Sequence, residues 1–74
     1  AANPKTRLSD WCGANNLPYA NYKTVAQDGP AHAPVFTVRV IIDDHGHATA
    51  QGPNKQEAEK AAAAALLEKL DTHD

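Results

Sequence analysis

Residues 52–70 read GPNKQEAEKAAAAALLEKL, and this stretch predicts a long helix that packs closely against the rest of the chain. Gly52 and Pro53 interrupt the preceding chain, Asn54 is placed to cap the helix, and Glu57 follows three residues later, as in a capping box. The positions expected to face inward, at spacings of three and four, are Ala58, Ala61, Ala62, Ala65, Leu66 and Leu70. Because alanine is small, such a helix brings its backbone close to its neighbour, and larger side chains elsewhere must supply the volume of the core.

The larger side chains are predicted to come from a sheet. Residues 35–42, VFTVRVII, alternate in the manner of a half-buried central strand. The face expected to turn inward carries Phe36, Val38, Val40 and Ile42. A shorter strand is expected near residues 20–27, and a third at 48–51 after the turn sequence DDHGH at 43–47. Two successive hairpins predict an antiparallel meander.

An earlier helix begins at Asn3-Pro4, since Asn favours the N-cap and Pro the first helical position. It is expected to run roughly to Ala14. The side chains expected to turn inward are Leu8, Trp11 and Cys12. The order α-β-β-β-α predicts an α+β two-layer sandwich, in which a three-stranded antiparallel sheet carries both helices on one face. We expect residues 1–74 to form a single domain with a core of about 4–70.

Composition restricts the classes of function. Seven Lys and Arg against nine Asp and Glu give a net charge of −2, which argues against a general polyanion binder, because nonspecific nucleic-acid affinity comes mainly from neutralising phosphates. The single cysteine, Cys12, can form no internal disulfide, and the sequence shows neither a signal peptide nor a long apolar run. We therefore expect an intracellular location and no membrane partner. The missing initial methionine suggests a module of a longer protein.

Three spaced motifs carry a family likeness: PKTRLSDW at 4–11, GPAHAPVFTVRV at 29–40, and the closing stretch at 52–70. They resemble the double-stranded RNA-binding domain, and the likeness covers almost the entire chain. The resemblance implies a reader of A-form RNA shape that spans about 16 base pairs, with no cofactor, no small-molecule substrate and no catalytic residue in this fragment. PKTRL, GPAHAPVFTV and AEKAAAAALL are similar to the domain that ends bacterial ribonuclease III, whereas DWC resembles domains attached to RNA helicases.

The first contact region that the resemblance implies is the outer face of the first helix. There Thr6, Ser9 and Asp10 match positions that touch a minor groove. Small polar side chains suit a 2′-hydroxyl, which both donates and accepts hydrogen bonds. Ser9 and Asp10 are shorter than the Gln and Glu that are usual in the family. A merely solvated helix face is the other interpretation of these residues.

The second implied region is the loop of Gly29, Pro30, Ala31 and His32, which the resemblance places in the next minor groove with the histidine near a ribose. Gly and Pro are sufficient to form a turn, so the turn conformation does not require the histidine. The prolines stiffen the loop, and a rigid loop loses less entropy on docking. The alternative is a histidine that packs onto its own hairpin.

The third implied region is the start of the second helix, where the family usually carries three lysines that bind phosphates. Here Asn54, Lys55 and Gln56 match it, with Lys60 peripheral, while Glu59 replaces a lysine, as in members of the ribonuclease III type. The free N–H groups and positive dipole end of the helix add to the charge of Lys55. We therefore expect weak, salt-sensitive, shape-selective binding.

Other chemistry has less support. Cys12 lies on the inward stripe of its helix, where an inert thiol is expected rather than a nucleophile. The carboxylates and imidazoles of residues 43–47 point apart in a tight turn, so no metal site is predicted. The remaining alternative is a protein-protein interaction or dimerisation module with weak or no RNA binding. The net charge of −2 favours it, and its exposed surface could include Ile41 and the outer face of the first helix.

Overall fold

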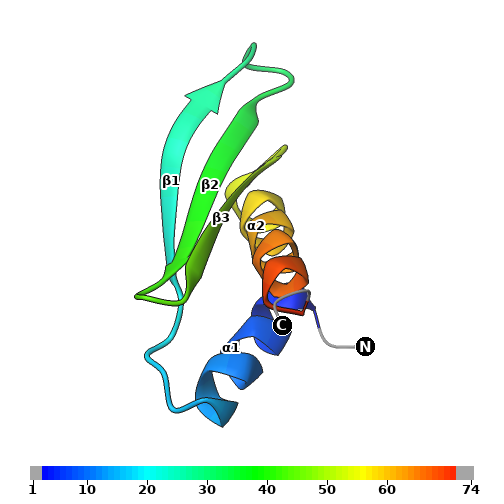
Figure 1. The fold of residues 1–74 in the computed structure, drawn as a ribbon. Coiled ribbons are helices and arrows are strands. Elements are labelled where there is room, and N and C mark those ends of the chain that lie inside the picture. The colour runs from blue at the N-terminus through cyan, green and yellow to red at the C-terminus, as the bar shows by residue number, and fades with distance from the viewer. Residues whose placement is uncertain (1–2, 72–74) are drawn as a thin grey trace.

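The computed structural model describes residues 3–71 of the chain. The elements, in order, are α1 (Pro4–Ala14), β1 (Asn21–Asp28), β2 (Val35–Ile42), β3 (Gly46–Gly52) and α2 (Lys55–Asp71). The strands form one antiparallel sheet in the order β1-β2-β3, and both helices lie on the same side of it (Figure 1). The predicted α-β-β-β-α two-layer architecture is confirmed.

Both helices begin at an asparagine cap, as predicted. Asn3 Oδ1 accepts a hydrogen bond from the Thr6 backbone N–H at 3.0 Å. Asn54 Oδ1 accepts one from the Glu57 backbone N–H at 2.9 Å. Each bond satisfies one of the N–H groups that a helix start leaves without an intrahelical partner. The asparagines therefore set the first residue of each helix.

The central strand has the predicted bounds, and its two neighbours differ from the prediction in detail. β3 is longer than residues 48–51, because Gly46 pairs with Ile42 at one end and Gly52 pairs with Phe36 at the other. The β1–β2 register shifts between Thr24 and the residue two positions later, which marks a bulge in β1. Periodicity alone does not reveal this bulge, since the extra residue is defined only by what lies opposite it.

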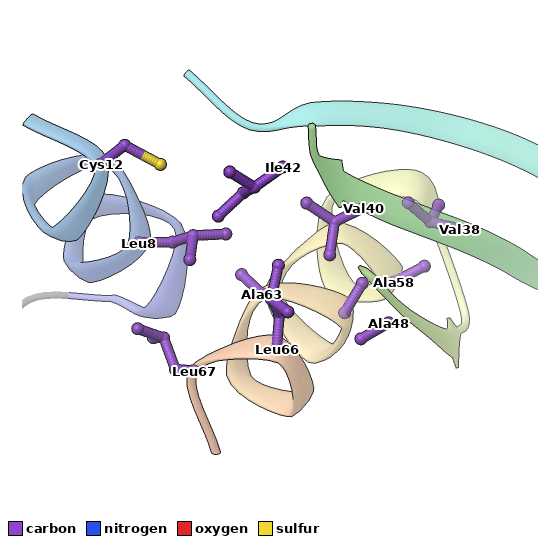
Figure 2. Close-up of a cluster of buried hydrophobic side chains, with 11 residues drawn as sticks. Leu8, Cys12, Val38, Val40, Ile42, Ala48, Ala58, Ala63, Leu66 and Leu67 are labelled. Atoms are coloured by element: carbon purple, nitrogen blue, oxygen red, sulfur yellow. The ribbon is translucent and has the colours of Figure 1, made fainter. Parts of the chain in front are cut away.

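The core lies between the sheet and the two helices, with side chains from α1, β2, β3 and α2 pointing toward one another (Figure 2). Its buried members are Leu8, Cys12, Val38, Val40, Ile42, Ala48, Ala58, Ala62, Ala63, Leu66 and Leu67. Trp11 and Phe36, which were expected in the core, are only partly buried and pack against its rim. The alanines of α2 therefore face larger residues of β2 and α1, as the small-residue stripe predicts.

The buried stripe of α2 is displaced from the predicted one. Ala63 and Leu67, which the prediction leaves out, are buried, whereas Ala61, Ala65 and Leu70 are only half-buried. The reason is that α2 has two neighbours, because it packs against α1 as well as the sheet, and Leu67 lies on the side of α1 (Figure 2). A single stripe at i, i+3 and i+4 assumes one covered face.

Candidate nucleic-acid interface

The first predicted contact region is an exposed helix face. Thr6, Ser9 and Asp10 of α1 are all exposed, whereas Leu8 and Cys12 are fully buried. Burial of these two apolar side chains, one turn apart, directs the polar face of the helix toward solvent. Two hydroxyl groups and a carboxylate are therefore available there to donate or accept hydrogen bonds.

The second region is a tight loop between β1 and β2. Gly29 has a φ of 84°, and a Cβ at this position would lie 2.7 Å from the Ala33 carbonyl oxygen, so the loop requires glycine. The Ala33 N–H donates to the Pro30 carbonyl oxygen at 2.9 Å, which closes a turn around Ala31 and His32. Both of these enclosed residues are exposed. The local geometry thus presents the His32 ring at the tip of a constrained loop.

The third region is the first turn of α2, where Lys55 and Gln56 are exposed beside the Asn54 cap. Among residues 3–71, Lys55 has no ion-pair or hydrogen-bond partner, so its ammonium is available for an anion. Lys60 differs, because its Nζ lies 3.2 Å from the Glu57 carboxylate one turn earlier in the same helix. The helix start adds backbone N–H groups and a positive dipole end to the charge of Lys55.

A pocket of about 670 Å³ lies between the second region and the end of β3, just before the third region. His32, Ala33 and Pro34 of the β1–β2 loop line one part of it, and Gly52 and Pro53 line another. The cap of α2 follows Pro53 directly, and the loop and the first turn of α2 lie toward the same end of the sheet (Figure 1). The β1–β2 loop and the start of α2 therefore lie toward the same end of the sheet (Figure 1).

An ion pair that sequence reasoning missed joins the third region to the first. Lys5 Nζ lies 2.5 Å from Glu59 Oε1 and 5.1 Å from the centroid of the Tyr22 ring. Lys5 directly precedes Thr6, and Glu59 lies one helical turn after Lys55. An acid within a segment that usually carries cations is a hint that a cation lies nearby. The sequence does not identify that cation, because the partners are 54 positions apart.

The environment of this ion pair alters the ionisation of Tyr22. The pKa of the Tyr22 phenol is raised from 10.0 to about 12, first because the ring is partly buried and then because of the negative charges of Glu59 and Cys12. Loss of the phenol proton would place a negative charge close to the Glu59 carboxylate, and this repulsion disfavours it. Lys5, which lies beside both groups, is the cation that balances Glu59.

Cys12 is fully buried, and burial raises the pKa of its thiol, an effect that a backbone hydrogen bond to Ala20 opposes. The thiolate is the reactive form, so both its rarity and its burial slow attack on an alkylating reagent. We expect iodoacetamide to modify the native protein on the order of 100-fold more slowly than the urea-unfolded protein, because reaction requires local opening. Mass spectrometry of timed samples measures both rates. Equal rates would show that Cys12 is accessible in the native fold.

The turn at residues 43–47 has a structural role in the described part of the chain. His45 Nδ1 lies 2.9 Å from the Asp43 carbonyl oxygen, and its ring meets the Trp11 ring edge-on with centroids 6.5 Å apart. Within residues 3–71, no group of three or more His, Cys, Asp or Glu side chains is arranged to hold a metal ion. No helix in this part of the chain has the length and apolar character needed to cross a membrane.

Comparison with known proteins assigns the chain to a family. The model of the double-stranded RNA binding motif matches residues 4–70, which is nearly the whole described fold. The chain belongs to this family. Double-stranded RNA binding is therefore the function that this membership indicates. The α-β-β-β-α fold described above is the one that the sequence motifs of the chain predict.

Relatives and solved structures agree with this membership. Ribonuclease 3 of Rhodobacter capsulatus is 45% identical to this double-stranded RNA-binding domain over 71 residues, which cover 96% of the domain and 31% of the relative. Ribonuclease 3 of Caulobacter vibrioides is 48% identical over 66 residues, which cover 89% of the domain and 29% of that relative. A chain from the structure of Arabidopsis HYL1 superposes with a TM-score of 0.80 at 30% identity, covering 93% of the domain and 97% of that chain.

The domain therefore spans less than a third of the length of these ribonuclease 3 relatives. The matches support the predicted resemblance to the domain of bacterial ribonuclease III. They give no support to the resemblance with RNA helicase domains.

Proposed function

We propose that this domain binds double-stranded RNA by its A-form shape, as the RNA-targeting module of a longer protein of the ribonuclease III type. Polar side chains of α1 contact one minor groove, and the β1–β2 loop with His32 enters the next. The start of α2 binds phosphates of the major groove between them. The phosphate contacts set the register, and the 2′-hydroxyl contacts distinguish RNA from DNA.

The observation that carries the proposal is the succession of the three regions along the molecule. The β1–β2 loop shares a pocket with Pro53, next to the start of α2, and the Lys5–Glu59 ion pair joins α2 to α1 beside Thr6. An A-form duplex offers a minor groove, the phosphates across the major groove and a second minor groove in the same succession, over about 16 base pairs. The order of the protein contacts therefore suits the order of the RNA surfaces.

The charges of the interface indicate modest affinity. Lys55 is unpaired within residues 3–71, whereas Lys5 and Lys60 are each engaged with a glutamate. If Lys55, the helix start and one further donor neutralise about two or three phosphates, log K should fall with log salt at a slope of about −2 to −3. Strong binding that depends little on salt would not fit this charge pattern.

Replacement of Lys55 by alanine should lower the affinity for a duplex RNA of about 20 base pairs roughly tenfold and make the salt slope about one unit shallower, because one phosphate contact is lost. Fluorescence anisotropy titrations at several KCl concentrations measure both quantities. Lys23→Ala is the matched control. Lys23 is also exposed, but it lies opposite Arg39 in the β1–β2 register, on the face of the sheet away from the helices.

Three outcomes would contradict the proposed function in whole or in part. A Lys23→Ala variant that loses as much affinity as Lys55→Ala would show that binding follows overall charge rather than the proposed site. A wild-type domain that binds neither duplex RNA nor duplex DNA would instead favour the protein-interaction alternative. Equal binding to RNA and DNA duplexes would remove the 2′-hydroxyl contacts from the mechanism.

A further inference from the structure

We propose that the Lys5–Glu59 ion pair orients α1 relative to the start of α2 for RNA binding, so that Glu59 is a positioning residue rather than a repulsive charge at the interface. This inference rests on the proposed function and names what sets the spacing between its first and third contact regions. A glutamate beside a phosphate site would otherwise be expected to weaken binding.

Lys5 occupies a corner at which three elements meet. Its ammonium bonds to Glu59 of α2 and lies over the ring of Tyr22 of β1, while its backbone belongs to the first turn of α1. The side chains of Lys5 and Glu59 are 38% and 25% exposed, so water is partly excluded from the pair. Such a pair is screened less by salt than a fully exposed one, and it ties the start of α1 to one carboxylate of α2.

The apolar contacts of α1 lie in the middle and the C-terminal part of the helix. Leu8 and Cys12 are buried one turn apart, and half-buried Trp11 packs beside them. The described residues before Leu8 include no buried one, so the start of the helix is held less firmly than its middle. The Lys5–Glu59 bond ties this start of α1 to α2, which restricts rolling of the helix about its own axis. The direction in which Thr6 faces depends on it.

Removing the charge of Glu59 should change RNA affinity in opposite directions, depending on whether Glu59 positions α1 or repels phosphates. Glu59 lies one turn from Lys55, so an uncompensated carboxylate there would repel the phosphates that Lys55 binds. If repulsion were its main effect, removing the charge would strengthen RNA binding. If Glu59 positions α1, removing the charge weakens RNA binding, even though the interface becomes more positive.

The test compares two neutralising substitutions in the same helix. Glu59→Gln should weaken binding to a duplex RNA of about 20 base pairs by about two- to fivefold, the upper part of the range expected when a partly exposed ion pair is lost. Glu57→Gln is the matched control, because Glu57 is also in the first two turns of α2 but pairs with Lys60 of the same helix. It should leave the affinity unchanged or raise it about twofold, since it removes a negative charge and releases a lysine.

A charge-swapped variant, Lys5→Glu with Glu59→Lys, should bind more tightly than Glu59→Gln, because the pair re-forms with the same net charge. Melting curves restrict the titrations to temperatures at which every variant is folded, so that lost stability is not counted as lost affinity. Binding by Glu59→Gln that equals or exceeds the wild type, or a swapped variant that stays as weak as Glu59→Gln, would overturn the inference and leave the proposed function standing. A wild-type domain that binds no duplex RNA would overturn both.

Discussion

Leu66→Ala should lower the free energy of unfolding by about 3–5 kcal/mol, one of the two largest effects expected for a single substitution in this domain. Leu66 is fully buried, and its Cδ1 lies close beneath Gly46, where an added Cβ would be 3.3 Å away. Its neighbours on α2 include Ala62 and Ala63, whose side chains are too short to fill the cavity left behind. Because a domain of this size has a total stability of about 4–11 kcal/mol, the substitution should remove a large fraction of that stability.

Urea denaturation followed by circular dichroism measures this loss. Leu70→Ala is the matched control, because it removes the same atoms from the same helix at a half-buried position. It should cost about 1 kcal/mol. Equal losses in the two variants would mean that α2 is not packed as described.

Gly52→Ala should cost about 2–3 kcal/mol of stability and also displace the first turn of α2, where phosphate binding is proposed. A Cβ at Gly52 would lie 2.5 Å from the Ala58 backbone nitrogen and 2.9 Å from the Glu57 carbonyl carbon. These are main-chain atoms of the first turn of α2, so they can make room only if that turn moves. Lys55, which belongs to the same turn, would move with it.

Thermal unfolding and RNA titration of the remaining folded protein measure the two effects separately. Gly13→Ala serves as the control, because a Cβ there meets no atom within 4 Å and the residue lies inside α1. It should stabilise the domain by about 0.5–1 kcal/mol, owing to the higher helix propensity of alanine. A Gly52→Ala variant as stable as the wild type would show that β3 and α2 are not in close contact at this point.

The local features of this fold follow from its sequence. Asn3-Pro4 and Asn54 signal the two helix starts, and the alternation of VFTVRVII gives the bounds and the buried face of β2. These signals are readable because a cap, a turn or a strand face depends on residues a few positions apart. The residue types of the candidate interface are equally visible, since Thr6, His32 and Lys55 were selected from motifs alone and all three are exposed.

The arrangement of these features depends on packing between distant segments. The displaced stripe of α2, with Ala63 and Leu67 buried, arises because α1 covers a second side of that helix. The pairing of Lys5 with Glu59 likewise joins residues 54 positions apart. Periodicity reports which side of an element is apolar, but it does not report which neighbours that element acquires. Sequence alone therefore determined the elements and the polar groups that they carry, whereas tertiary contacts placed those groups next to one another.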